Sequence, residues 1–556
     1  MSNPPTSQLG VSSTPKHTPG GLRPATVRDA TFDVLRRLGL TTLFANPGST
    51  EVPFLTDLPD DLRFVLGLHE SAVVGMATGF ALGRREPALA ILHTTAGLGN
   101  AVAAIATARV NRAPLVVLVG QQDRRHLALE PFLAGRLDGL AGEYPVWVDQ
   151  PVRPQDVPGA VARASHEART GRGPALVIVP MDDWLAPAGE SWEEAAPSLV
   201  LEARAAAPSA VATLGALLSG ASAPALVVGA GAGDPESWSA LTLLAERLGC
   251  PVWQEPFGAR AGFPQDHSLF AGHLPASRSR LRETLAGRDV VLVVGAPAFR
   301  QYPYESGPFV AEDTVVAVVS DDPAEVHRSP VALAVLAPPA AVCAALAEQV
   351  EPRDGPLAPL FERLEPPPAP AAGEPLRAGH LLAALAKRLP ANAILVEEAP
   401  SSRPELHARI PARSPLGFVS AAMGGLGFAL PGAAGLRMAL PDRPVVAVAG
   451  DGSALYSIQS LWSAARYGAG ALFVVLANGG YAVMDRLAEQ HGGSGPWPSF
   501  HVDATGLARS FGCAARRVET FDDLTRTLDD VVPSLAERDE PLLLEVAVAP
   551  DAAFAP

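Results

Sequence analysis

Hydrophobic residues along the chain fall into short continuous runs that alternate with stretches of helical periodicity. The segment 25–40 (ATVRDATFDVLRRLGL) spaces its apolar residues by three and four, which predicts a helix, and TTLFANPG (41–48) follows as a strand that ends in a turn. Runs such as ALAILH, PLVVLVG, VVLVVGAP, TVVAVVS and PVVAVAGDG end at glycine or at a polar residue. They predict short buried strands of parallel sheets, separated by helices.

Three segments of biased composition divide the chain. Residues 1–24 are rich in Ser, Thr, Pro and Gly and lack periodicity, so we expect a disordered N-terminal arm. Two Pro-rich segments, at about 183–208 and at 351–375, are predicted interdomain linkers because such chain forms extended spacers. The remaining blocks are 25–185, 205–350 and 376–550. Each alternates strands with helices, so the predicted fold class is α/β, with three parallel-sheet domains.

Composition excludes several classes of function. A net charge of −15 without a basic stripe argues against nucleic acid or an anionic membrane as a partner. No apolar stretch reaches the roughly 18 residues that a membrane span needs. The two lysines, Lys16 and Lys387, leave almost no candidate for a Schiff base or a P-loop. Three widely separated cysteines predict neither a disulfide scaffold nor a zinc site, and we expect a cytoplasmic protein.

The sharpest polar signal follows two predicted strands of the third block. Asp451, Gly452 and Ser453 come after PVVAVAG, and Asn478 follows ALFVVLA one helical crossover later. Ligands of parallel sheets bind beyond the carboxyl ends of the strands. Carboxylate and amide oxygens suit Mg²⁺, and backbone N–H groups of Gly452 and Ser453 suit a phosphate. The alternative is a plain Asp-Gly turn.

This pairing resembles the diphosphate-binding motif of thiamin diphosphate-dependent enzymes, which is GDG followed by a pair of Asn after one crossover. The first Asn of the pair is Ala477 here. The resemblance implies Asp451, Asn478 and the main-chain carbonyl of Gly480 as ligands of Mg²⁺ or Ca²⁺. NPGSTEVPFL, LHESAVVGMATGFAL, LHTTAGLGN, GQQDRR, GAPAFR and AAMGGLGFALP are similar to the benzoylformate decarboxylase type of 2-oxo acid decarboxylase, along nearly the whole chain.

The resemblance implies roles for residues around the cofactor. Glu70 would hydrogen-bond the aminopyrimidine N1′ and so promote formation of the nucleophilic ylid. The Gly424 carbonyl would receive the 4′-amino group, and Leu426 would support the bent cofactor. The implied cofactor-binding set is Glu70, Gly424, Leu426, Asp451, Gly452, Ser453, Asn478 and Tyr481. The alternatives are that Glu70 is only the acid of a helix N-terminus and that Leu426 is only a core residue.

Ser49 and His93 match two polar active-site residues of the family. The Ser contacts the substrate carboxylate and the His assists proton transfer. The alternatives are a helix cap for Ser49 and a satisfied buried imidazole for His93. Where the family has a second catalytic His, this sequence has Tyr302, which suits hydrogen-bond donation better than proton relay, or which only fills volume.

An apolar substrate pocket also follows from the resemblance, and it suits an aryl or bulky 2-oxo acid better than pyruvate. Ordinary core packing is the alternative for its apolar members. The implied lining is Ser49, Phe132, Leu133, Met484 and Leu487. The implied activity is non-oxidative decarboxylation of a benzoylformate-like 2-oxo acid to an aldehyde and CO₂ by a carboxy-lyase. A thiamin diphosphate-dependent carboligase that forms 2-hydroxy ketones is the alternative, favoured by Tyr302, and a non-catalytic relative is a third.

The resemblance also implies a cofactor held between the first domain of one subunit and the third domain of another. At least a homodimer, and more specifically a homotetramer, is therefore expected. In the middle block, GAGAGD (229–234) lacks a complete G-x-G-x-x-G motif, because Pro235 and Glu236 follow Gly233. We expect no dinucleotide there.

Overall fold

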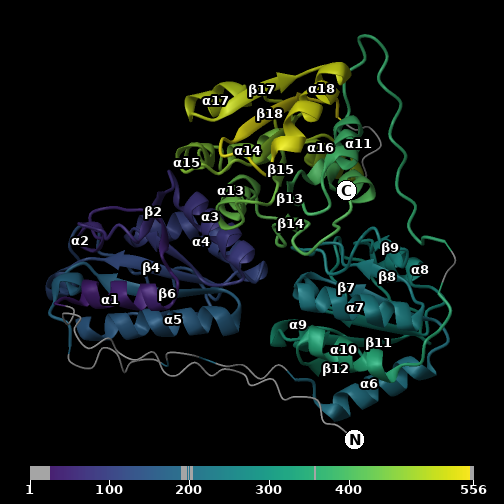
Figure 1. Ribbon diagram of the computed structural model, residues 1–556, viewed down its shortest axis with the longest axis horizontal. Helices are drawn as coiled ribbons and strands as arrows, with labels where there is room; N and C mark the ends of the chain where they lie inside the picture. Colours follow the sequence, from purple (N-terminus) through teal and green to yellow (C-terminus); the bar gives the residue numbers. More distant parts are fainter. Residues whose placement is uncertain (1–24, 190–196, 198–199, 201–204, 356–357, 551–556) are drawn as a thin grey trace, which may run out of the picture.

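The computed structural model describes residues 25–189, 197, 200, 205–355 and 358–550, and the predicted arm at 1–24 lies outside the described residues. Each of the three blocks contains one six-stranded sheet, and the paired strands of all three sheets are parallel. Figure 1 shows the three domains at the corners of a triangle. The predicted fold class, α/β with three parallel-sheet domains, is confirmed.

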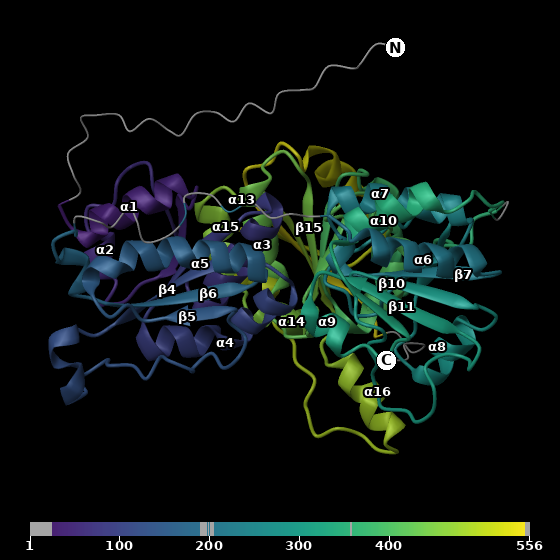
Figure 2. The same ribbon diagram turned by 90° about the horizontal axis from the view of Figure 1, so that it is seen from below.

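The first domain has the strand order β2-β1-β3-β4-β6-β5. Its strands are β1 (Thr42–Asn46), β2 (Arg63–Leu66), β3 (Ala88–Leu92), β4 (Leu115–Gln121), β5 (Trp147–Asp149) and β6 (Pro174–Pro180). Its helices are α1 (Val27–Arg37), α2 (Val52–Leu55), α3 (Glu70–Arg84), α4 (Thr94–Val110) and α5 (Val157–Gly171). Figure 2 shows α1 and α5 on one face of the sheet and α4 on the other. Strands β3, β4 and β6 are buried along their whole length because helices cover both faces of the sheet.

The middle domain has the order β12-β11-β10-β7-β8-β9. Its strands are β7 (Pro224–Val228), β8 (Val252–Gln254), β9 (Phe270–His273), β10 (Val290–Val294), β11 (Val315–Ser320) and β12 (Leu333–Leu336). Its helices are α6 (Pro208–Gly220), α7 (Pro235–Leu248), α8 (Arg278–Thr284), α9 (Pro323–His327) and α10 (Pro339–Gln349). The chain therefore starts at a central strand, runs to one edge, and returns to build the other half.

The third domain has the order β14-β13-β15-β16-β18-β17. Its strands are β13 (Ile394–Glu398), β14 (Phe418–Ser420), β15 (Val445–Gly450), β16 (Leu472–Ala477), β17 (Ala514–Val518) and β18 (Leu542–Ala547). Its helices are α11 (Ala378–Arg388), α12 (Arg403–Arg409), α13 (Ala429–Ala439), α14 (Asp451–Leu455), α15 (Ser460–Arg466), α16 (Ala482–Gln490), α17 (Ala504–Ser510) and α18 (Phe521–Val531). Strands β15 and β16 are neighbours, so their carboxyl ends open on one edge of the sheet.

Helices α3 and α13 join the first and third domains at very short range. One apolar cluster contains buried residues of both domains. Helix α3 carries glycine at every fourth position, at Gly75, Gly79 and Gly83. A β-carbon on Gly79 would lie 2.1 Å from the carbonyl oxygen of Gly432, so the two backbones touch. Contacts advance from Pro431 opposite Gly75 to Ala439 opposite Gly83, so the helices run parallel and both begin at the same end.

The described part of the predicted linker at 351–375 packs against the middle domain. The Leu360 amide donates to the Ser268 carbonyl (3.0 Å), and the Phe361 ring packs on Phe270 with centroids 5.7 Å apart. None of the helices among the described residues is both long and apolar enough to cross a membrane.

Candidate active site

Glu70 is the first residue of α3 and is 7% exposed. Its Oε1 accepts a hydrogen bond from Asn46 Nδ2 and its Oε2 accepts one from Asn100 Nδ2, both at 3.0 Å. Helix α3 is capped instead by His69, whose side chain accepts from the Ser71 amide. The Glu70 carboxylate therefore serves neither as the cap nor as an acid free in solvent. Sequence reasoning missed both asparagines, although Asn46 opens the NPG turn.

His93 lies between β3 and α4 and is held by a buried carboxylate. Its Nδ1 lies 2.9 Å from Glu51 Oε2 and 3.0 Å from Thr50 Oγ1. Glu51 is 3% exposed and also accepts from the Gly48 amide (2.7 Å). Because Nδ1 is engaged, Nε2 is the ring nitrogen left for another group. Glu51 and Thr50 were missed, although they directly follow the predicted Ser49.

His93 and Glu70 are neighbours across Gly97, in the first turns of α4. A β-carbon on Gly97 would lie 3.3 Å from His93 Cβ and 3.5 Å from Glu70 Cγ. Ser49 is exposed in the same loop as Glu51. Since α2 starts at Val52 and Ser49 is not its cap, the helix-cap interpretation of Ser49 is wrong.

The four apolar residues predicted for the substrate pocket come from two domains. Phe132 is 87% exposed and Leu133 has φ of +67° in the loop after β4. Met484 is 41% exposed and Leu487 half-buried on α16, a helix that buries none of its residues. Ordinary core packing therefore does not account for them, and their role as a pocket stays a prediction.

Asp451 and Asn478 meet at the carboxyl ends of β15 and β16. Asp451 Oδ1 accepts from the Gly452 amide and Oδ2 from the Gly479 amide, both at 2.8 Å. Asn478 Oδ1 accepts from the Gly480 amide at 3.1 Å. Burial raises the pKa of Asp451, while the amides of Gly479 and Gly452 act in the opposite direction. Gly479 has φ of +73°, a conformation that glycine adopts without strain.

The loop with Gly424 and Leu426 precedes α13 and is fixed by a buried acid that sequence reasoning missed. Glu398, at the end of β13, accepts from the amides of Gly427 (2.6 Å) and Phe428 (2.7 Å) and so caps this helix. Burial raises the pKa of Glu398 to about 7. Gly424 is exposed with φ of +72°, and Leu426 is half-buried. Nothing in this geometry makes Leu426 an ordinary core residue.

Tyr302 lies in the loop after β10 and is 57% exposed. Its backbone amide donates to the Ala276 carbonyl at 3.0 Å. Nearby Arg300 donates to the Phe257 carbonyl (3.0 Å) and to the Ala422 carbonyl (3.2 Å). The middle domain thereby holds the start of the third-domain loop that leads to Gly424.

Three domain families match the chain in order. They are described as thiamine pyrophosphate enzyme, N-terminal TPP binding domain (residues 25–141), central domain (211–346) and C-terminal TPP binding domain (404–546). The chain is 38% identical to the benzoylformate decarboxylase of Pseudomonas aeruginosa over 533 residues, which are 94% of this chain and 98% of that protein. The chain belongs to the benzoylformate decarboxylase family of thiamine pyrophosphate enzymes.

Solved structures agree with this membership. The thiamine diphosphate-dependent 4-hydroxybenzoylformate decarboxylase of Rhodococcus jostii has a TM-score of 0.90 at 36% identity, with 95% of this chain and 100% of that chain covered. The benzoylformate decarboxylase of Polynucleobacter necessarius has a TM-score of 0.90 at 32% identity, covering 96% and 100%. The predicted resemblance and the predicted class, a thiamin diphosphate-dependent 2-oxo acid carboxy-lyase, are confirmed.

The residues of this family member fit thiamin diphosphate and a divalent cation. A β-carbon on Gly452 would lie 2.8 Å from the Tyr481 ring, so glycine lets that ring pack close to the backbone at the start of α14. Asp451 has no described cationic partner, and the described residues contain no cluster of three His, Cys, Asp or Glu. One carboxylate, the Asn478 amide and the Gly480 carbonyl leave the remaining positions of a hard cation to phosphate oxygen and water.

Proposed function

We propose that this enzyme decarboxylates an aromatic or bulky 2-oxo acid of the benzoylformate type to the aldehyde and CO₂, using thiamin diphosphate and Mg²⁺. The observation that carries the proposal is the placement of His93, held by buried Glu51, next to Glu70 across Gly97. An imidazole that can exchange a proton, placed beside a fixed carboxyl group, suits a decarboxylation that is followed by protonation. When bound, thiamin diphosphate supplies the carbon nucleophile and the electron sink.

The chain's own residues supply proton exchange, hydrogen bonds to the substrate and an apolar lining. Glu70 holds or releases a proton at Oε1 or Oε2, and Asn46 and Asn100 fix the plane of its carboxyl group. His93 exchanges a proton at Nε2, while Glu51 keeps its ring oriented through Nδ1. Ser49 and the Tyr302 hydroxyl serve as hydrogen-bond donors to the substrate. Phe132, Leu133, Met484 and Leu487 exclude water from it.

The metal and diphosphate belong to the third domain. Asp451, Asn478 and the Gly480 carbonyl would hold Mg²⁺, and the amides of Gly452 and Ser453 would face phosphate oxygens. Tyr481 and Phe500 back this position with ring centroids 5.0 Å apart. Leu426 and Gly424 would support the cofactor from the loop before α13.

The functional unit is at least a homodimer and, as we propose, a homotetramer. The resemblance supports this proposal, because in the family the cofactor lies between the first domain of one subunit, here with Glu70, and the third domain of another, here with Asp451 and Asn478. Mixing Glu70→Gln with Asp451→Asn tests this arrangement. Mixed dimers then contain one intact site, and random exchange restores about one quarter of wild-type activity. No recovery would place both residues in a site of one chain.

The function itself is tested with purified protein, benzoylformate, thiamin diphosphate and Mg²⁺. We expect CO₂ and benzaldehyde in equal amounts, and no turnover when the metal is removed with EDTA, with recovery when Mg²⁺ is returned. A protein that binds the cofactor but leaves benzoylformate unchanged contradicts the substrate assignment. A 2-hydroxy ketone as the main product, with an added acceptor aldehyde, favours the carboligase instead.

Three buried free cysteines support a reducing, cytoplasmic location.

A further inference from the structure

In an open α/β sheet, the position beyond the carboxyl ends of the strands where the strand order reverses is called the crevice, and in the middle domain it lies beyond β7 and β10. The strand order reverses there, because the chain runs outward from β7 to β9 and returns to β10 beside β7. Ligands of open α/β sheets bind at such a reversal. A β-carbon on Gly231 would lie 2.8 Å from Gly295 Cα and 2.6 Å from Arg112 Nη1. A side chain of the first domain therefore fills the crevice of the middle domain.

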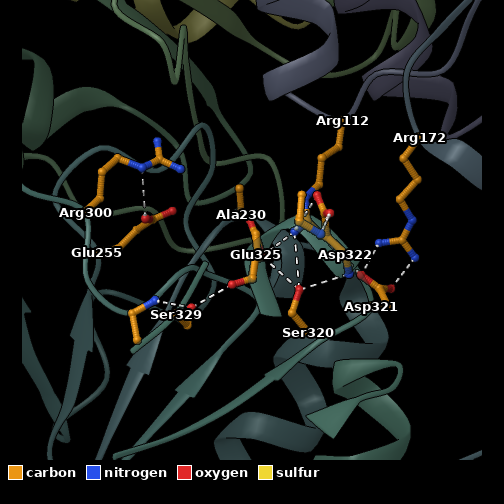
Figure 3. Close-up of polar contacts among 12 residues, drawn as sticks. Arg112, Arg172, Ala230, Glu255, Arg300, Ser320, Asp321, Asp322, Glu325 and Ser329 are labelled. Atoms are coloured by element: carbon orange, nitrogen blue, oxygen red, sulfur yellow. Dashed lines mark hydrogen bonds and ion pairs between the residues drawn. The ribbon is translucent and has the colours of Figure 1, made fainter. Parts of the chain in front are cut away.

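The guanidinium of Arg112 is matched to carboxylates that surround it (Figure 3). Nη1 lies 3.2 Å from Asp321 Oδ1, and Nη2 lies 2.5 Å from Glu325 Oε2 and 3.7 Å from Asp322 Oδ2. The Arg112 side chain is 5% exposed. Arg172 donates to the same Asp321 at 2.8 Å. Although burial lowers the pKa of Arg112, the three carboxylates raise it above its ordinary value overall.

The backbone of Arg112 is in a conformation that favours glycine. Arg112 follows the end of α4 with φ of +57°, where helices usually place a glycine. A non-glycine residue there is strained, and such strain persists where the side chain has a use. Arg85, at the end of α3, has the same φ of +57°, but its pair with Glu236 is half-exposed on both sides. Exposed pairs of that kind contribute little to stability.

We propose that the crevice of the middle domain is a guanidinium-binding socket, filled by Arg112, which fixes the first domain on the middle domain and takes the place of a dinucleotide. Carboxylates of Asp321, Asp322 and Glu325 around Arg112, with Arg172 sharing Asp321, suit a guanidinium. The ligand class is thus a planar cation with several N–H donors. This inference concerns domain docking, and its test does not depend on the proposed reaction.

The direction in which Arg112→Gly shifts the midpoint of thermal unfolding tests the proposal. If the side chain had no use, glycine would relieve the backbone strain and raise the midpoint of thermal unfolding. If the socket needs the guanidinium, the midpoint falls by about 5 °C or more, because the buried Glu325 and the half-buried Asp322 lose their cationic partner. Arg85→Gly is the matched control, with the same φ and an exposed pair, and we expect it to be unchanged or more stable. A stabilised Arg112→Gly variant would overturn the proposal.

Chemical rescue of Arg112→Ala identifies the ligand class. Low-millimolar guanidinium chloride is compared with the same concentrations of sodium chloride and of urea. We expect guanidinium to reverse more than half of the decrease in the unfolding midpoint of Arg112→Ala and to leave the midpoint of Arg85→Ala unchanged. Equal effects of the three additives contradict the socket. Where Arg112→Ala does not fold, Arg112→Lys serves instead. We expect it to be destabilised, since one ammonium cannot serve three carboxylates, and wild-type stability there also contradicts the proposal.

Equilibrium dialysis of the wild type against ADP and FAD is the independent measurement. We expect no saturable binding. Binding that Arg112→Ala strengthens would show that the crevice is a nucleotide site which Arg112 only obstructs, and that result would also overturn the proposal.

Discussion

Replacing Gly79 with alanine tests how closely α3 and α13 are packed. In a helix interior, alanine is favoured over glycine by about 1 kcal/mol. The added β-carbon, however, would lie 2.1 Å from the Gly432 carbonyl oxygen, whereas ordinary contact begins near 3.4 Å. The helices must therefore separate locally by about 1.3 Å, the difference between those distances. Overpacking costs about 1–3 kcal/mol or more in adaptable cores, so against backbone we expect a net loss of about 2 kcal/mol or more.

Thermal unfolding followed by circular dichroism measures this loss. For a domain of this size we expect the midpoint to fall by about 4–8 °C. Gly220→Ala is the matched control, because Gly220 ends α6 and a β-carbon there meets nothing within 4 Å. We expect that control to be neutral or slightly stabilised. Equal or greater stability of Gly79→Ala would refute the close approach of the two helices.

Three further predictions follow from buried polar groups. Glu51→Gln is expected to lower kcat with benzoylformate about 10-fold or more, without changing the affinity for thiamin diphosphate, because His93 loses its orienting carboxylate; unchanged kcat contradicts that role. Asn111→Ala removes two buried hydrogen bonds, to the Ser420 carbonyl (2.9 Å) and from the Ala422 amide (3.0 Å). We expect the free energy of unfolding in urea to fall by about 2 kcal/mol and the cofactor to bind more weakly. A urea midpoint equal to that of the wild type would contradict this expectation. Burial raises the pKa of Glu255 to about 7, above the value of about 4.3 in an unfolded chain, so wild-type stability falls as pH rises between these values. Glu255→Gln should therefore raise the unfolding midpoint at pH 8 and leave it nearly unchanged near pH 4, and equal gains at both pH values would count against the assignment.

The strands and the closeness of Asp451 to Asn478 were predictable because both follow from local patterns. Short apolar runs that end at polar residues identify buried parallel strands, and one crossover between Asp451 and Asn478 implies adjacent strand ends, as the pairing of β15 with β16 shows. The Glu51–His93 pair was not predictable from spacing. The pair forms because β1 and β3 are neighbours in the sheet, and no local sequence pattern predicts that pairing.

The contacts between domains were also beyond the sequence. Asn111 and Arg112 bind residues about 200 to 300 positions away, in two different domains. Their only local signal is an arginine where a helix usually ends in glycine. The four-residue spacing of glycines in α3 is visible in the sequence, but its partner helix is not.

In the substrate pocket proposed above, the exposure of helix α16 affects how the substrate range can change. Figure 2 shows it projecting from the third domain, and none of its residues is buried. Elements with few buried contacts open most readily by local unfolding, and replacing their side chains disturbs little of the rest. Met484 and Leu487 can therefore vary without weakening the fold, whereas Glu70 begins α3, whose backbone touches that of α13. With the pocket proposed above, substrate selectivity can therefore evolve on α16 while Glu70 stays fixed on α3.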